Sequence, residues 1–174
     1  MKKNFSPIVL IALTGVMVVG GVAGAATDAT VTATVTVQNI SMTLSQSSFA
    51  YGTMAANTAS STLTLFGGAG IVATNDGNVT SDFDIYGADT ANWTLGATTD
   101  SDQYIHKFCN DTDNDCTLPG GAANYTALTT SPATLKNSVA SSGTTAFQLQ
   151  ITAPNPSTVY TEQSVGVTVQ ISAS

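Results

Sequence analysis

The sequence predicts an all-β protein, a single two-sheet antiparallel β-sandwich with jelly-roll or Greek-key (Ig-like) connections. Three observations support this fold class. Apolar residues recur at every second position in several short segments, which is the period of a half-buried strand. Turn-forming residues separate these segments, and none of them shows the apolar period of a helix. Charged residues make up only 9% of the 174 residues, and the abundant Thr residues suit a pleated surface.

Residues 1–25 precede this pattern and are predicted to be a cleavable signal peptide. Two lysines form a positive N-terminal region, an apolar run follows from Ile8 to Val22, and Ala23–Ala25 are small residues of the kind that signal peptidase reads. The alternative is an uncleaved membrane anchor, but Gly and Thr interrupt the run, and a spanning helix needs about 20 apolar residues. We therefore expect a signal peptide at 1–25 and a β-sandwich domain at 26–174, in a secreted or cell-surface protein.

The first predicted strand is Thr30 to Leu44. Val or Ala alternates with Thr as far as Val37, and the apolar residues then change parity at Gln38–Asn39. A one-residue change of parity moves the buried face to the other side, so we expect a bulge or sharp bend there. Such a bend would carry the strand from one sheet to the other. Because the segment begins the exported chain, the alternative is that it is free to move.

The remaining strands are predicted where alternation or a short apolar run lies between turn residues. The turn at Asn75–Asn78 predicts a hairpin between the strands on either side of it, with Asp82 and Asp84 in water. Trp93 is the single Trp, and we expect it to pack between the sheets, with an exposed sugar-stacking platform as the alternative. The predicted strands are 60–66, 71–73, 80–86, 93–95, 104–109, 125–128, 133–139, 146–152 and 164–174.

The charge balance excludes two classes of partner. Once residues 1–25 are removed, the basic residues are Lys107 and Lys136, with no Arg, against eleven acidic residues. A chain with no basic patch has nothing with which to neutralise phosphates, so nucleic-acid binding is not expected. An anionic membrane surface would repel the chain as well, and no stable membrane span is expected after cleavage.

Two cysteines, Cys109 and Cys116, are predicted to form a disulfide, because this is the usual state of paired cysteines in an exported chain. The enclosed loop is short, so its entropic stabilisation is about 2–3 kcal/mol. The alternatives are a metal-binding pair and a redox pair. The spacing C-x6-C, with a single His in the chain, matches neither pattern well.

The loop between the cysteines is the sharpest candidate for a metal site. Asp111, Asp113 and Asp115 form a D-x-D-x-D pattern, which is the first half of a calcium loop. Alternating carboxylates on a tight loop can converge on one Ca²⁺ ion, and without a cation they repel one another. An EF-hand is excluded, because Cys116 and Ala122 stand where it needs Gly and Glu. The alternative to a calcium site is a solvated acidic hairpin tip.

No catalytic site is predicted. His106 is the only His and shares its strand parity with Tyr104 and Phe108, which indicates an ordinary strand position. The sequence contains neither G-x-S-x-G nor H-E-x-x-H, and without Arg it has no bidentate anion clamp. A secreted hydrolase that uses His106 with a Ser and an Asp is the alternative. Beyond the candidate Ca²⁺, no cofactor is expected.

The layout of the chain resembles that of exported β-sandwich surface proteins. The signal peptide, the alternating N-terminal strand and the turn Ala73–Val79 followed by Phe83–Ile85 are similar to TasA/camelysin-type fibre proteins and, more loosely, to fimbrial or spore-coat-type subunits. The resemblance implies a structural role, with itself or other cell-surface components as partners. It also implies that Val31 to Val37 fills alternate pockets of the next subunit by β-strand addition. The alternatives are that this strand pairs within its own domain, and that the protein is a calcium-dependent adhesion or carbohydrate-binding module.

Overall fold

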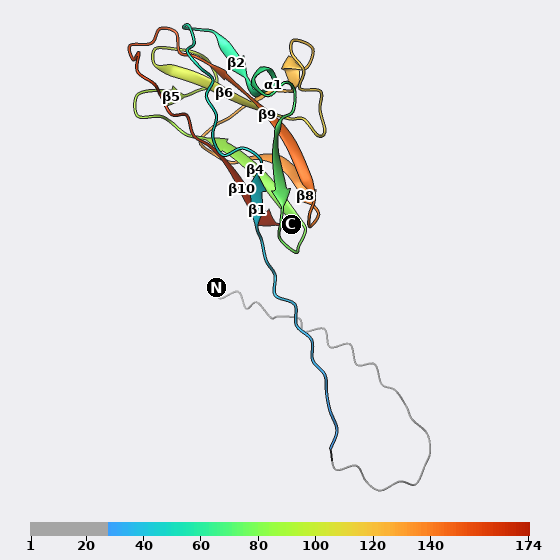
Figure 1. Cartoon of the computed structure of the whole chain (residues 1–174). Coiled ribbons are helices and arrows are strands. Elements are labelled where there is room, and N and C mark those ends of the chain that lie inside the picture. The colour runs from blue at the N-terminus through green and yellow to red at the C-terminus, as the bar shows by residue number, and fades with distance from the viewer. Residues whose placement is uncertain (1–27) are drawn as a thin grey trace, which may run out of the picture. The chain divides into compact units, whose positions relative to one another are not determined.

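In a computed structural model that describes residues 28–174, the chain is built almost entirely of strands and loops (Figure 1). The predicted signal peptide, residues 1–25, lies outside the described residues. No helix within 28–174 is long and apolar enough to cross a membrane. The elements are β1 (Met42–Leu44), β2 (Ala59–Ser61), α1 (Thr62–Leu65), β3 (Ile71–Asn75), β4 (Ser81–Gly87), β5 (Thr94–Leu95), β6 (Gln103–Asn110), the 3-10 helix η1 (Ala122–Asn124), β7 (Thr126–Ala127), β8 (Ala133–Val139), β9 (Thr144–Thr152) and β10 (Val167–Ala173).

The strands form two sheets that pack together, which confirms the predicted all-β sandwich. The larger sheet has the order β1-β3-β9-β6-β5, with β2 also paired to β9 and β7 to β6. The smaller sheet has the order β10-β4-β8. All pairings are antiparallel except the two-residue pairing of β5 with β6.

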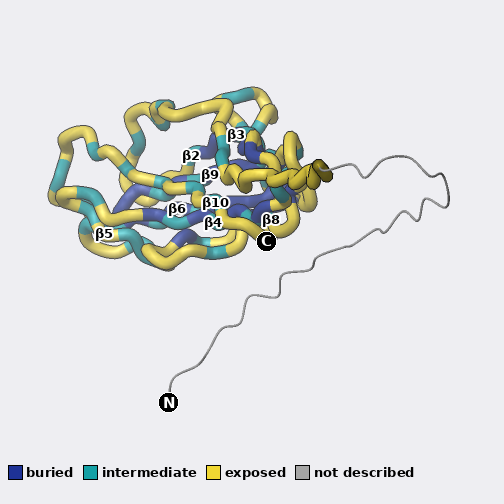
Figure 2. Tube along the Cα trace, turned by 90° about the horizontal axis from the view of Figure 1, so that it is seen from below, coloured by how far each residue is buried: buried dark blue, intermediate teal, exposed yellow. Residues whose placement is uncertain are grey.

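The core lies between the two sheets, built from alternate residues of their inner faces. In Figure 2 the buried residues gather along the strands in the middle of the folded part. β4 shows the underlying pattern, because its odd-numbered residues are buried and its even-numbered residues are partly exposed. Strand alternation thus separates a buried layer from a solvated one. The core cluster consists of Ile71, Ala73, Phe83, Ile85, Phe108, Leu128, Leu135, Val139, Phe147 and Leu149.

The predicted hairpin around Asn75–Asn78 is wrong. β3 pairs with β1 and β9, whereas β4 pairs with β10 and β8, so the turn carries the chain from one sheet to the other. The Asn75 side chain explains this course, because it is fully buried and its Nδ2 donates to the carbonyl oxygens of Val79 and Val139. Asp82 and Asp84 are partly exposed on β4, as expected, and Asp82 Oδ1 accepts from the Ser138 N–H.

The predicted strand at 60–66 is also wrong in its second half. After β2, the chain forms the four-residue helix α1. The Thr62 hydroxyl, on the first residue of α1, lies 2.8 Å from the Leu149 backbone nitrogen of β9. Gly67 and Gly68 follow with positive φ angles of 61° and 91°, a conformation that ends the helix without a Cβ penalty.

Of the predicted strand Thr30–Leu44, only Met42–Leu44 is a strand. Residues 28–41 form neither helix nor strand, so the predicted passage from one sheet to the other through a bend at Gln38–Asn39 does not occur. β1 joins the larger sheet by pairing with β3. The folded unit that contains both sheets spans Thr36–Ser174.

Candidate functional site

The residues that precede the folded unit make an exposed apolar segment, which we call the arm (residues 28–35). Residues 28–35 form neither helix nor strand. Val31 and Val35 are 91% and 90% exposed. No charged residue lies between Asp28 and Asp76. The arm therefore combines the side-chain alternation of a half-buried strand with the exposure of a strand that has no partner.

The turn at Asn75–Asn78 fixes the chain that follows the arm. Asn78 Nδ2 donates to the Val37 carbonyl oxygen at 2.8 Å, and Asn78 Oδ1 accepts from the Asn39 N–H at 2.8 Å. The Asn78 N–H donates to the Asn39 carbonyl oxygen at 3.0 Å. A Cβ at Gly77 would overlap that same carbonyl oxygen, so Gly77 lets the two chain segments approach closely. The chain is thus held from Val37 onward.

The edge strands of the two sheets differ in how well they are protected. The edge strands of the larger sheet are short: β1 and β2 have three residues each, and β5 and β7 have two each. β8, one edge of the smaller sheet, carries Lys136, has Ser138 at a positive φ of 56°, and pairs with β4 through two register shifts. Charges and bulges of this kind discourage edge-to-edge pairing. The other edge, β10, has seven residues in unbroken register with β4 and carries no charge.

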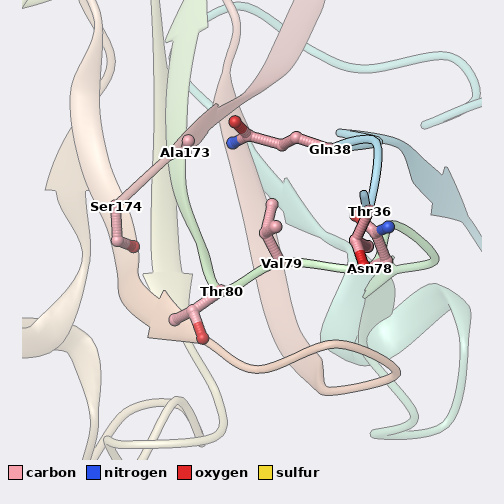
Figure 3. Close-up of a pocket in the computed structure, with 7 residues that line it drawn as sticks. All are labelled: Thr36, Gln38, Asn78, Val79, Thr80, Ala173 and Ser174. Carbon is pink, nitrogen blue, oxygen red and sulfur yellow. The ribbon is translucent and has the colours of Figure 1, made fainter. Parts of the chain in front are cut away.

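A shallow pocket lies at the C-terminal end of β10 (Figure 3). Ala173 and Ser174 form one side of it, and Thr36 and Gln38, on the chain that leads to β1, form another. The side chain of Gln38 extends toward Ala173 across the opening (Figure 3). The end of the free β10 edge is therefore open to solvent.

The acidic loop is closed by the predicted disulfide, which is confirmed. Cys109 and Cys116 are joined with their Cα atoms 5.9 Å apart, and both are buried. They pack with Tyr125, whose hydroxyl donates to the Cys116 carbonyl oxygen at 3.1 Å. Burial, reinforced by the charge of Asp111, raises the pKa of the Tyr125 hydroxyl. The loop is thus fixed at its base by a second buried cluster, separate from the core cluster.

Within this loop the three Asp side chains bind different partners. Asp111 Oδ2 accepts from Gln148 Nε2 at 2.9 Å, and Asp113 forms an ion pair with Lys136 at 2.7 Å. Asp115 Oδ1 accepts from the side chain and the backbone N–H of Thr117, which holds the pKa of the Asp115 carboxyl below its usual value. Among residues 28–174, no three His, Cys, Asp or Glu side chains gather in a group able to hold a metal. The calcium site stays a prediction.

That prediction requires Asp113 to exchange Lys136 for a cation. If the loop binds Ca²⁺, Lys136→Gln is expected to raise the affinity a few-fold, because it removes a competing charge from a partly exposed pair. Asp113→Ala is expected to abolish the binding heat, because it removes a carboxylate ligand. Titration calorimetry of the parent protein and both variants measures these effects. No binding heat from either the parent protein or Lys136→Gln would contradict the calcium prediction.

His106 lies on β6 and is 1% exposed. A hydrogen bond of 2.9 Å joins its Nε2 to the Tyr51 hydroxyl, and the rings of Tyr51 and Tyr104 pack near it. Burial lowers the pKa of His106 from 6.5 to about 4, so the ring is neutral at pH 7. A hydrolase would need His106 between a hydroxyl nucleophile and a carboxylate, and in the described residues its hydrogen-bond partner is Tyr51 instead. That the protein is not an enzyme stays a prediction.

Trp93 is partly buried and packs beside Tyr104, with ring centroids 6.2 Å apart. It lies outside the core cluster between the sheets, contrary to our expectation. Its Nε1 is buried and has no hydrogen-bond partner in the described part of the chain. The alternative of a sugar-stacking platform stays a prediction.

Comparison of this chain with protein-family models, with curated proteins and with solved structures finds no match in any of the three. The similarity in layout to TasA/camelysin-type fibre proteins stays a prediction.

Proposed function

We propose that this protein is an exported structural subunit, placed outside the cell or at its surface, that assembles with copies of itself by β-strand addition. In this process an extended segment of one chain completes a sheet of another, with backbone hydrogen bonds giving affinity and alternate side chains giving register. The arm is the donor segment. A head-to-tail contact of this kind does not close on itself, so repetition produces a filament.

The observation that carries the proposal is the exposure of Val31 and Val35 in a segment that has strand alternation and no charge after Asp28. A solvent-exposed tail normally holds charged or polar residues that keep it solvated. Here alternate positions are apolar, so the arm has a side that is stable only when covered. Burying two Val side chains in a neighbouring subunit contributes about 3–6 kcal/mol before the cost of ordering the arm.

Assembly of the chain from residue 26 onward is expected at rising protein concentration, in filaments visible by negative staining. Val31→Gln combined with Val35→Gln should reduce the assembled fraction at least tenfold, because the apolar side of the arm is lost while its charge and length are unchanged. Sedimentation of the parent protein and the variant measures the assembled fraction over the same concentration series.

The arm supplies its own matched control. Thr32→Gln combined with Thr34→Gln makes the same chemical change at the positions of opposite parity, and assembly should be nearly unaffected. If both double variants assemble equally, side-chain parity is irrelevant and the donor role is wrong. If the parent protein remains a monodisperse monomer at all concentrations, with and without Ca²⁺, the proposed function itself is wrong.

A further inference from the structure

We propose that the free edge of β10 (Val167–Ala173) is the acceptor site and that its occupant is the arm of a second copy of this chain. This inference rests on the proposed function, which names the arm as donor but not the surface that receives it. β10 is the only edge among the described strands that combines length, regular register and freedom from charge. Pairing there would extend the smaller sheet from three strands to four.

The backbone of β10 presents its unused hydrogen-bonding groups on this edge. β10 pairs with β4 in unbroken antiparallel register, and the Ser174 N–H donates to the Thr80 carbonyl oxygen in continuation of that register. In an antiparallel ladder, successive residues direct their N–H groups alternately to the two sides of the strand. The outward N–H groups are therefore those of Val167, Val169, Ile171 and Ala173.

The side chains of β10 leave room for a neighbour. Val167, Val169 and Ile171 pack against the core cluster, yet all three are only partly buried, whereas the corresponding residues of the central strand β4 are fully buried. An added strand would cover the same layer with its own alternate side chains, and cross-strand pairs of β-branched residues stabilise a sheet. Val31 and Val35 of the arm supply such side chains, and Ala33 between them completes the two-residue period.

The distribution of charge favours contact between two copies at the β10 edge. The whole chain has a formal net charge of −7, so most of its surfaces repel one another. No charged residue lies from Gln163 to Ser174 or from Ala29 to Asn75. The acceptor edge is thus neutral, and the donor arm carries no charge after Asp28, its first residue, so both lack the gatekeeper charges that protect an ordinary edge strand.

A synthetic peptide of residues 28–38 tests the acceptor site independently of filament formation. The peptide is added to the Val31→Gln, Val35→Gln variant, whose own arm is a poor donor, and amide hydrogen exchange is followed by NMR. We expect exchange of Val167, Val169, Ile171 and Ala173 to slow at least tenfold. A peptide that carries the same two Gln substitutions should give no protection. Protection at another edge, or no binding of the parent peptide, would overturn the assignment.

Val169→Pro tests the same site in the full chain. Pro removes an outward N–H while leaving the pairing with β4 intact, which is tolerated on an edge strand. The variant should unfold cooperatively but no longer form filaments. Gln170→Pro removes an N–H that points to β4, and it should destabilise the fold itself.

Mixing two variants tests the pairing of donor and acceptor directly. Each of the two, Val169→Pro and the Val31→Gln, Val35→Gln variant, should be monomeric alone. When mixed they should form a one-to-one complex, because the first retains a donor arm and the second retains an acceptor edge.

The outcomes separate this inference from the proposed function. If assembly requires Val31 and Val35 but Val169→Pro assembles normally, the arm is a donor and β10 is not its acceptor. A different outcome is that the parent protein is monomeric and that Val169→Pro speeds hydrogen exchange of the arm amides. In that case the arm pairs with β10 of its own chain. That result would overturn the second copy as occupant.

Discussion

Asn75→Asp is expected to lower the free energy of unfolding by about 3–5 kcal/mol at pH 7, although it exchanges one amide nitrogen for an oxygen. Asn75 is fully buried, and its Nδ2 lies 2.8, 2.9 and 3.2 Å from the carbonyl oxygens of Val79, Val139 and Ala140. An introduced carboxylate would direct a charged acceptor at three carbonyl oxygens and could donate to none of them. Burying an unpaired charge and breaking this network are among the largest single-residue costs.

Chemical denaturation at several pH values measures the effect. The introduced carboxyl should have a raised pKa, because burial and the facing carbonyls both favour its neutral form. The difference in free energy of unfolding between the variant and the parent protein should therefore shrink as the pH falls through that raised pKa. The protonated carboxyl can then donate a hydrogen bond again. Asn78→Asp is the matched control, because Asn78 is exposed, and it should cost under about 1 kcal/mol. Equal costs for the two variants would contradict this role of Asn75.

Asn75 also shows why the sequence predicted the turn but not the topology. Asn, Asp and Gly at 75–78 indicate a turn from local chemistry alone. Whether the strands on either side pair with each other depends on contacts distant in sequence. The Asn75 side chain reaches Val139, 64 residues away, and this contact holds the end of β3 against the β8–β9 connection. The chain therefore passes between sheets where a local pattern indicates a hairpin.

Strict alternation predicts the strands β9 and β10 well. β9 and β10 were predicted because Phe147, Leu149 and Ile151, and Val167, Val169 and Ile171, alternate with polar residues. The same alternation in 30–37 gave a predicted strand that the described structure does not contain. A two-residue period reports that a segment is shaped for a sheet, and it does not report which chain supplies that sheet.

The three Asp side chains of the candidate metal loop do not gather at one point, and the reason again lies in contacts distant in sequence. The D-x-D-x-D spacing brings three carboxylates onto one short loop, which is all that sequence can establish. Their directions are set by Gln148 of β9 and Lys136 of β8, which lie 37 and 23 residues from Asp111 and Asp113. These partners are brought to the loop only by the pairing of the strands, so the loop sequence does not indicate them. The disulfide was predictable because its two cysteines are the only pair in the chain.

Acidification from pH 7 to pH 4 is expected to lower the free energy of unfolding by about 3 kcal/mol through His106 alone. Burial lowers the pKa of His106 from 6.5 to about 4. Between these values the unfolded chain binds a proton that the folded chain does not, so stability falls as the pH falls below about 6.5. The loss is complete below about pH 4, where both states are protonated. A shift of this size corresponds to about 3 kcal/mol at about 1.4 kcal/mol per pKa unit.

Protonating His106 in the folded protein is costly because the described residues around it lack a second hydrogen-bond acceptor and a countercharge. An imidazolium has two N–H donors and needs two acceptors. His106 Nε2 faces the Tyr51 hydroxyl, but Nδ1 is buried without a partner in the described residues, and the other ring beside it is that of Tyr104. Both tyrosines have a pKa raised chiefly by burial, so they remain neutral and offer no countercharge.

Urea denaturation of the parent protein and of His106→Gln from pH 7 to pH 4.5 isolates this contribution. Gln keeps a polar group opposite Tyr51 but does not titrate, so its stability should be nearly flat over this range. The carboxyls of Asp82, Asp102 and Asp115 have lowered pKa values, so they lose their stabilising effect only below about pH 4. If the free energy of unfolding falls equally with pH in the two proteins, a group other than His106 causes the acid sensitivity. A slope confined to the parent protein would show that mild acid acts where Tyr51 anchors the loop between β1 and β2 on the larger sheet.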